Sequence, residues 1–203
     1  MAEPRYPSLD AYVDALPEGS ASYPECKAKA SLLRDMLASR PIDPEAEDLP
    51  VELARIIRDP PPVSMWIPEV SFNAATLAIY DREFGGTDLA RFEDWVCDFN
   101  AALFRKPLYR VLFLFISPRR LLSNVASRWG AFHRGSTLTL VDLGNDTARL
   151  RLQYPSGLFG EVMLHAFGAA WRAAILTAGA SSVRSEISRT TATQADYDVR
   201  WFD

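Results

Sequence analysis

Two neighbouring runs of alternating apolar and polar residues, 136–143 and 147–154, are the feature that most constrains the fold. The second run separates its side chains into an apolar face and a polar face: Ala148, Leu150, Leu152 and Tyr154 against Arg149, Arg151 and Gln153. A period of two is typical of a strand with one buried and one solvent-facing side. The intervening Gly144-Asn-Asp146 tolerates positive φ values, so the two runs predict a β-hairpin.

A helix and two more strands are predicted after this hairpin. Residues 158–178 carry small and apolar side chains at helical spacing, and Gly179 follows them as a helix-ending residue. Residues 182–190 and 195–201 alternate again, and the last run places Tyr197, Val199 and Trp201 on one face. The order predicts a ββαββ unit, in which one helix covers a four-stranded antiparallel sheet.

The first 135 residues contain helical patterns separated by proline and glycine. One predicted helix runs from Glu25 to Ala38, and another begins at Ser117-Pro118 and continues to Gly135. Residues 108–116 are apolar nearly all round, so we expect them in the centre of the helical part. We therefore predict an α+β protein with a single domain over residues 1–203. Its mainly helical residues 1–135 form a layer on the ββαββ part, residues 136–203.

The composition argues against a membrane or nucleic-acid partner. The longest uncharged apolar run, residues 111–116, is far shorter than the roughly 20 residues that span a bilayer. The first residues lack the basic and apolar regions of a signal peptide, so we expect a cytoplasmic protein. No nucleic-acid-binding motif accompanies the arginines, so we expect no nucleic-acid partner.

The chain has two cysteines and two histidines, which limits metal and acid–base chemistry. Cys26 and Cys97 stand apart from any metal-ligand spacing, so we expect reduced thiols and no metal site. His133 falls in the last turn of a predicted helix, where a cation interacts well with the helix terminus. The sequence contains no phosphate-binding loop, nucleophile elbow or zinc-protease motif, which favours a protein that is not an enzyme.

One arrangement supports an enzyme as an alternative hypothesis. His165 lies one helical turn after Glu161 and seven residues before Arg172, so the three side chains share an edge of the predicted helix. In this alternative, Glu161 and His165 are the catalytic candidates, with Glu161 orienting His165 as a base in a cleft bordered by Arg172.

Aromatic residues make up 11% of the chain and mostly indicate core. Helices packed on one small sheet can also leave an apolar cavity between the layers. We expect such a cavity beside Phe159, Phe167 and Trp171 of the predicted central helix, with Arg172 at its rim. This interpretation favours a binding or regulatory module that holds a small apolar ligand or a partner protein, without a cofactor.

Residues 105–151 hold nine basic and two acidic residues in a chain of net charge −4. This basic segment either faces acidic parts of its own chain or binds an acidic protein. In the second case the partner-binding candidates are Arg119, Arg120, Arg128 and Arg134. The predicted sheet also has two edge strands, whose unpaired backbone groups must be covered by another element or by a second copy. A homodimer is therefore a further hypothesis.

Short motifs within residues 85–202 resemble a known family. They are Arg119-Arg-Leu-Leu-Ser123, Gly135-Ser-Thr-Leu-Thr-Leu140, Ala178-Gly-Ala180, Val183-Arg-Ser-Glu186 and Tyr197-Asp-Val-Arg-Trp201. In this order they resemble a paralogous domain family of unknown function found in myxobacteria. More distantly, the segment is similar to 4-vinyl-reductase-type and haem/nitric-oxide-associated sensor domains. The resemblance implies the α+β fold and a sensor-like role. Such sensors often carry cysteine or histidine near the last hairpin, and residues 190–193 have neither.

Overall fold

The computed structural model describes residues 6–45, 49–110 and 116–202. The first half contains α1 (Pro7–Ala15), a 3-10 turn (Gly19–Ala21), β1 (Lys27–Lys29), α2 (Ala30–Ser39), α3 (Val51–Arg58), β2 (Trp66–Pro68), α4 (Glu69–Phe84) and α5 (Leu89–Arg105). The second half contains α6 (Pro107–Arg110), α7 (Pro118–Ser123), α8 (Val125–Gly130), β3 (His133–Arg134), β4 (Thr137–Leu143), β5 (Thr147–Gln153), α9 (Glu161–Thr177), β6 (Ser182–Thr191) and β7 (Gln194–Phe202).

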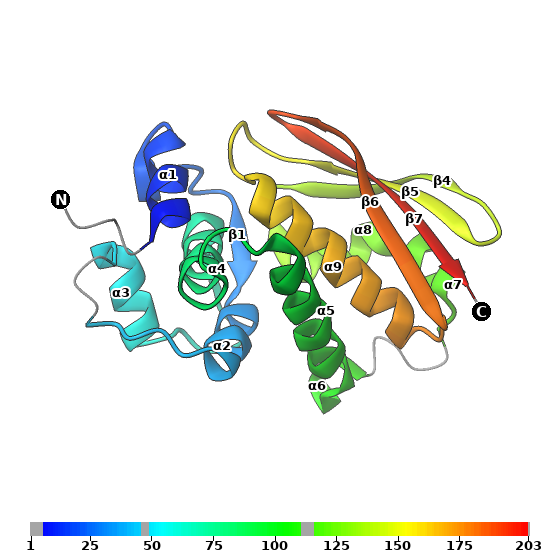
Figure 1. Cartoon of the computed structure of the whole chain (residues 1–203), viewed down its shortest axis with the longest axis horizontal. Coiled ribbons are helices and arrows are strands. Elements are labelled where there is room, and N and C mark those ends of the chain that lie inside the picture. Colours follow the sequence, from blue (N-terminus) through cyan, green and yellow to red (C-terminus); the bar gives the residue numbers. More distant parts are fainter. Residues whose placement is uncertain (1–5, 46–48, 111–115, 203) are drawn as a thin grey trace.

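The C-terminal part forms the predicted four-stranded antiparallel sheet, in the order β4-β5-β7-β6. Helix α9 lies along one face of this sheet, and α5 packs on the side of α9 that faces the N-terminal helices (Figure 1). The expected inner faces are confirmed: Leu150 and Leu152 of β5 and Tyr197 of β7 are fully buried. The α+β class and the ββαββ order are therefore confirmed.

Helix α9 begins three residues later than the sequence predicts, at Glu161 rather than Leu158. A turn in which the N–H of Leu158 donates to the carbonyl of Pro155 precedes it, and Gly160 is the N-cap. Phe159 therefore lies before the helix and not on it, although its ring is buried.

A second, three-stranded sheet joins distant parts of residues 1–135, and the sequence did not reveal it. Its order is β2-β1-β3, and Ala28 is paired with both Ile67 and His133. The predicted helix from Glu25 is wrong at its start, because residues 27–29 form β1 and α2 begins at Ala30. Strands of two or three residues are too short to show an alternation of side chains.

The predicted single helix over residues 117–135 is also wrong. Ser117 caps α7 as expected, because its hydroxyl accepts the N–H of Arg120. Asn124 then leaves the helical conformation, with φ −114° and ψ 19°, and separates α7 from α8. His133 consequently lies in strand β3, buried, and does not sit at a helix C-terminus. Pairing of β3 with β1, which lies about a hundred residues earlier, overrides the local helical preference.

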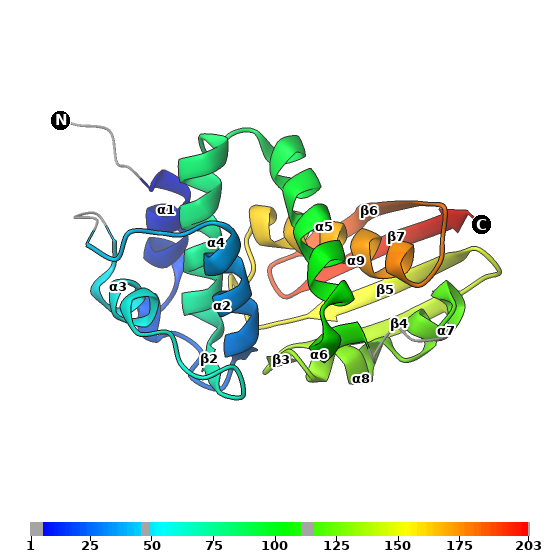
Figure 2. The same cartoon turned by 90° about the horizontal axis from the view of Figure 1, so that it is seen from below.

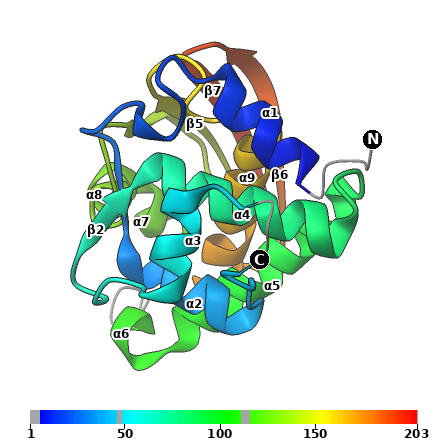
Figure 3. The ribbon, with the colours of Figure 1, turned by 90° about the vertical axis from the view of Figure 1, so that its left-hand side faces the viewer.

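Helix α4 crosses the centre of the N-terminal half, with α1, α2 and α3 around it (Figure 3). The Asp81 carboxylate of α4 accepts the backbone N–H groups of Ser8 and Leu9 and thereby holds the start of α1. Buried residues from both halves belong to one hydrophobic cluster.

The single domain over residues 1–203 stays a prediction. Most of the apolar stretch 108–116 lies outside the described residues, and no described helix is long and apolar enough to cross a bilayer.

Figure 2 shows the same arrangement from below, where α7 and α8 lie next to β4 and α5 lies between the N-terminal helices and α9. The face of the sheet away from α9 carries two arginine–aspartate pairs between β5 and β7. Arg149 binds Asp198 and Arg151 binds Asp196, each through two hydrogen bonds. The hydrogen bond from Arg151 holds the pKa of Asp196 below its ordinary value of 3.8, against the opposing effect of burial.

Replacing Arg151 with alanine should lower the free energy of unfolding at neutral pH and not in acid. Because the folded-state pKa of Asp196 is depressed, the pair stabilises the protein above about pH 3.8 and loses this effect as the pH falls through the lowered pKa. Urea unfolding of both proteins across a pH series measures the difference. Arg200→Ala on β7 is the control, and a difference from wild type that stays constant into acid would contradict the prediction.

Replacing Gly135 with alanine should destabilise the fold by about 2 kcal/mol or more. Gly135 has φ 79°, and a Cβ atom there would lie 2.5 Å from Cys26 Sγ and 2.8 Å from Cys26 Cα. Gly130 at the end of α8 is the matched control, because no atom would come within 4 Å of its Cβ. Gly130→Ala should leave the unfolding free energy unchanged or slightly raised. An equal loss of unfolding free energy in both variants would refute the prediction that the fold requires glycine at position 135.

Candidate functional site

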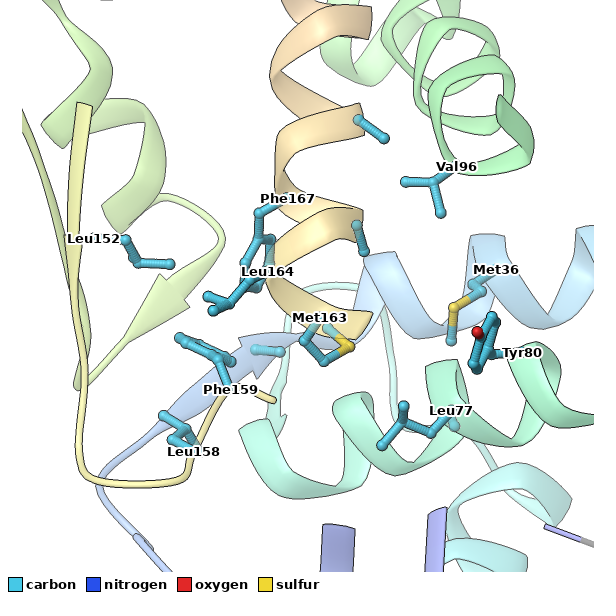
Figure 4. Packing of buried hydrophobic residues seen from close by; sticks show 14 of the residues in the cluster. Met36, Leu77, Tyr80, Val96, Leu152, Leu158, Phe159, Met163, Leu164 and Phe167 are labelled. Carbon is cyan, nitrogen blue, oxygen red and sulfur yellow. The ribbon is translucent and has the colours of Figure 1, made fainter. Parts of the chain in front are cut away.

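An apolar cavity of about 160 Å³ lies between α9 and the helices that face it. Its walls come from α2, α4, α5, α7, α8 and α9, so it sits between the N-terminal helices and the helix that covers the sheet. Figure 4 shows Met36, Val96 and Met163, which approach the same region from α2, α5 and α9. The site therefore depends on the packing of the two halves of the chain.

Helix α9 makes room for the cavity with small residues. Ala166, Ala170 and Ala174 follow one another at a spacing of four and therefore lie on one side of the helix, where all three line the cavity. Phe167 and Trp171 of the same helix close it with large rings. The sequence showed small side chains at helical spacing here, but it did not indicate that they border a cavity.

Helix α5 provides the opposite wall. Trp95 and Phe99 line the cavity, and their rings stack with centroids 5.7 Å apart. Trp129 of α8 adds a third large ring, in edge contact with Phe167 at 5.2 Å. An enclosure of this kind favours an apolar occupant.

Few polar atoms face this cavity, and most of them have partners. The Thr76 hydroxyl donates to the carbonyl of Phe72, and the Asn100 amide donates to the carbonyl of Val96. Trp171, which also lines the cavity, has a buried indole Nε1 with no hydrogen-bond partner among the described residues. An unsatisfied buried donor costs roughly 1–3 kcal/mol, so a ligand with an acceptor atom would gain from it.

A buried carboxylate–imidazole pair borders the cavity. Glu69, in the first turn of α4, is fully buried, and its two carboxylate oxygens lie 3.0 and 3.1 Å from Nδ1 of His133. A helix N-terminus stabilises a carboxylate, and the carboxylate in turn fixes Nδ1 of the imidazole as the proton-bearing nitrogen. The Trp129 ring stacks on the imidazole at 3.9 Å and its Nε1 donates to Ser136. No local sequence pattern indicates this pair, because 64 residues separate its members.

A polar groove of about 380 Å³ lies where α5, α9 and β6 meet, and it contains part of the predicted catalytic group. His165 and Arg172 line it, and Glu161 does not. The expectation that Glu161 orients His165 is wrong, since Nδ1 of His165 contacts the carboxylate of Glu93 from α5. Glu161 is exposed in the first turn of α9. Among the described residues, no group of three or more metal-binding side chains occurs.

The predicted ligand-binding residues occupy two different places. Phe167 and Trp171 line the apolar cavity. Phe159 lies behind Phe167, with ring centroids 4.9 Å apart. Arg172 lies in the polar groove and donates to Asp94 at 3.2 Å. Their roles in binding stay predictions.

The four arginines predicted to bind a partner lie in separate environments. Arg119 and Arg120 are exposed on α7, where Arg119 donates to the carbonyl of Gly144. Arg128 lines the apolar cavity, and burial lowers its pKa. Arg134 lies over the Trp66 ring at 4.0 Å.

Several other bases of the segment 105–151 face acidic residues of the same chain. Besides the two pairs on the outer face of the sheet, Lys106 binds Asp35 at 2.5 Å. The expectation that the basic segment meets acids of its own chain is met at these positions. A protein partner for the arginines on α7 stays a prediction.

Both cysteines are free thiols, as expected. Burial raises the pKa of Cys26 to about 11. Burial also raises the pKa of Cys97, while the neighbouring Arg172 acts in the opposite direction. Raised pKa values keep both side chains protonated and poorly reactive near neutral pH.

The described residues include two histidine–glutamate pairs, and we expect these pairs to differ in their contribution to stability. His133→Ala leaves the Glu69 carboxylate buried without its partner and should cost about 3–5 kcal/mol. His165→Ala removes one member of a pair whose side chains are 30% and 27% exposed, so the free energy of unfolding should fall by less than about 1 kcal/mol. Thermal and urea unfolding of the two variants measure the contrast. If both variants lose the same unfolding free energy, burial does not make the Glu69–His133 pair more important for stability than the Glu93–His165 pair.

Comparison with known proteins shows the fold. No family model matches the chain, and no curated protein matches its sequence. Among solved structures, the Fe(II) unliganded H-NOX protein from K. algicida is similar, with a TM-score of 0.52 and 9% identity, over 86% of this chain and 97% of that one. An oxygen-binding H-NOX domain related to soluble guanylate cyclases has a TM-score of 0.55 and 8% identity, over 85% and 92% of the two chains. The chain therefore has the fold of H-NOX domains.

Proposed function

We propose that this protein is a non-enzymatic sensory module that holds a small apolar molecule in the cavity between α5 and α9. The observation that carries the proposal is the cavity of about 160 Å³, which is enclosed mainly by aromatic and aliphatic side chains. An engineered cavity of roughly 150 Å³ with a similar lining stays dry and binds benzene. An occupant about the size of a substituted benzene fits this volume.

Haem is the group that the H-NOX fold implies, and the described residues do not fit it. A porphyrin joins several rings in one plane and needs far more room than a benzene ring. The imidazole that lines the cavity belongs to His133, which is bonded to Glu69 and covered on one face by Trp129. Among the described lining residues, Arg128 is the one fixed cation that could face the two propionates. The proposed ligand is therefore a small organic molecule.

The unpartnered Nε1 of Trp171 adds a chemical preference. A ligand that places a carbonyl oxygen against this N–H satisfies a buried donor, which an all-hydrocarbon ligand leaves unsatisfied. The ligand class that fits best is a small aromatic or aliphatic molecule with one hydrogen-bond acceptor. Occupation of the cavity would stabilise the contact between α5 and α9, which joins the N-terminal helices to the sheet part.

Native mass spectrometry of freshly purified protein, beside the same sample denatured, is the direct test for a retained ligand. Calorimetry with two molecules of nearly equal shape, cumene and acetophenone, then tests the cavity and its donor. We expect both to bind and acetophenone to bind more tightly by roughly tenfold, equivalent to about 1.4 kcal/mol. Trp171→Phe removes the donor and should abolish this difference. Absence of any retained mass together with no binding of either compound would refute the proposal.

Filling the cavity should prevent binding. Ala170→Leu places an isobutyl group in the apolar space, and we expect it to weaken the binding of cumene at least about tenfold. Ala102→Leu is the matched control, because Ala102 is an exposed residue of α5 that does not line the cavity. Binding that survives in Ala170→Leu, with the fold intact by circular dichroism, would place the ligand elsewhere.

A further inference from the structure

The β6 strand forms one edge of the four-stranded sheet, as Figures 1 and 2 show. It contacts β7 on one side and α9 beneath, whereas the opposite edge strand, β4, is flanked by α7 and α8. All ten residues of β6 are exposed or half-exposed. A long edge strand presents backbone N–H and C=O groups that have no partner within its own sheet. Such an edge is suited to pairing with another strand.

The part of β6 before its bulge has a self-complementary pattern. The register with β7 is regular from Ser182 to Ile187 and shifts between Ile187 and Arg189. On the outer face, Arg184 and Glu186 are exposed, and neither forms an ion pair within the described part of the chain. On the inner face, Val183 and Ile187 are half-exposed.

An antiparallel pairing of this segment with its own copy has one register that matches charges. If the twofold axis passes through Ser185, then Arg184 of each copy lies opposite Glu186 of the other, and Val183 lies opposite Ile187. An axis through Arg184 or Glu186 would instead place like charges against each other. Directly opposed unlike charges and apolar pairs stabilise a sheet, and like charges destabilise it.

The hydroxyl of Ser185 provides a second, independent observation. Its Oγ is buried and has no hydrogen-bond partner among the described residues. In the register centred on Ser185, the same hydroxyl of the second copy lies directly opposite, at a Cβ separation of roughly 4.5–5.5 Å, where serine and threonine hydroxyls bond to each other across strands. The hydroxyl packs toward Gly168 of α9, so rotation about its Cα–Cβ bond would bring it to its counterpart in the register that matches the charges.

We infer that two copies of this chain associate through antiparallel pairing of their β6 strands about Ser185, which makes one continuous eight-stranded sheet. The partner is a second copy of the same chain, because the pattern of charge, apolar side chains and hydroxyl is complementary to itself. Both α9 helices then lie on the same face of the joined sheet. The pairing is independent of the ligand proposed for the cavity.

Charge exchange at two positions tests this register. Sedimentation equilibrium over a concentration series should show a monomer–dimer equilibrium for the wild-type chain. In a dimer of Arg184→Glu, the new glutamate of each copy lies opposite Glu186 of the other copy. In a dimer of Glu186→Arg, the new arginine of each copy lies opposite Arg184 of the other copy. Each variant should therefore raise the dimer dissociation constant at least about tenfold. An equimolar mixture of the two variants restores both unlike pairs and should form a heterodimer. The double variant Arg184→Glu/Glu186→Arg should again form a homodimer.

The control variant is Arg189→Glu, which makes the same charge change on β6 beyond the bulge and should leave dimerisation unchanged. Circular dichroism confirms that each variant is folded. A wild-type chain that stays monomeric over the whole concentration series would overturn the inference. Single variants that dimerise as tightly as wild type, or a mixture that fails to form the heterodimer, would overturn the register.

Discussion

The buried contact between Glu69 and His133 ties together the elements on which the rest of the structure depends. Glu69 begins α4, the central helix of the N-terminal half, and His133 belongs to β3, directly before the hairpin of the large sheet. A buried carboxylate requires a partner, because desolvation of an unpaired charge is costly. The pair therefore anchors β3, which leads into the hairpin of the large sheet, to the first turn of α4. Trp129, stacked on the imidazole, forms part of the wall of the cavity.

The apolar cavity and the polar groove differ in chemistry because different faces of α9 form them. One face carries alanines and large rings and borders the apolar cavity, whereas His165 and Arg172 on another face border the polar groove beside β6. In the groove, His165 and Arg172 are already paired with Glu93 and Asp94. The cavity is lined mainly by aromatic and aliphatic side chains. This contrast is the reason that the proposed ligand belongs to the cavity.

Much of the C-terminal half followed from the sequence. The alternation in residues 147–154 and 195–201 assigned the buried face of β5 and β7 correctly, because a sheet that is covered on one side repeats every two residues. Phe167 and Trp171 were expected beside a cavity because helices packed on a small sheet can leave apolar space, and both residues line the cavity. The partner of His165 was not predicted correctly, because Glu93 lies on another helix, 72 residues away.

The sequence by itself determined the α+β class, the order of the ββαββ unit and the polarity of its sheet faces, since these depend on local periodicity. The tertiary structure decided the three-stranded sheet, the position of His133 in a strand, and the neighbours of each titratable group. Strands of two or three residues carry no periodic signal, and a pairing between distant residues leaves no trace in local spacing. The cavity also arises only in the tertiary structure, because its volume depends on how six helices pack against one another.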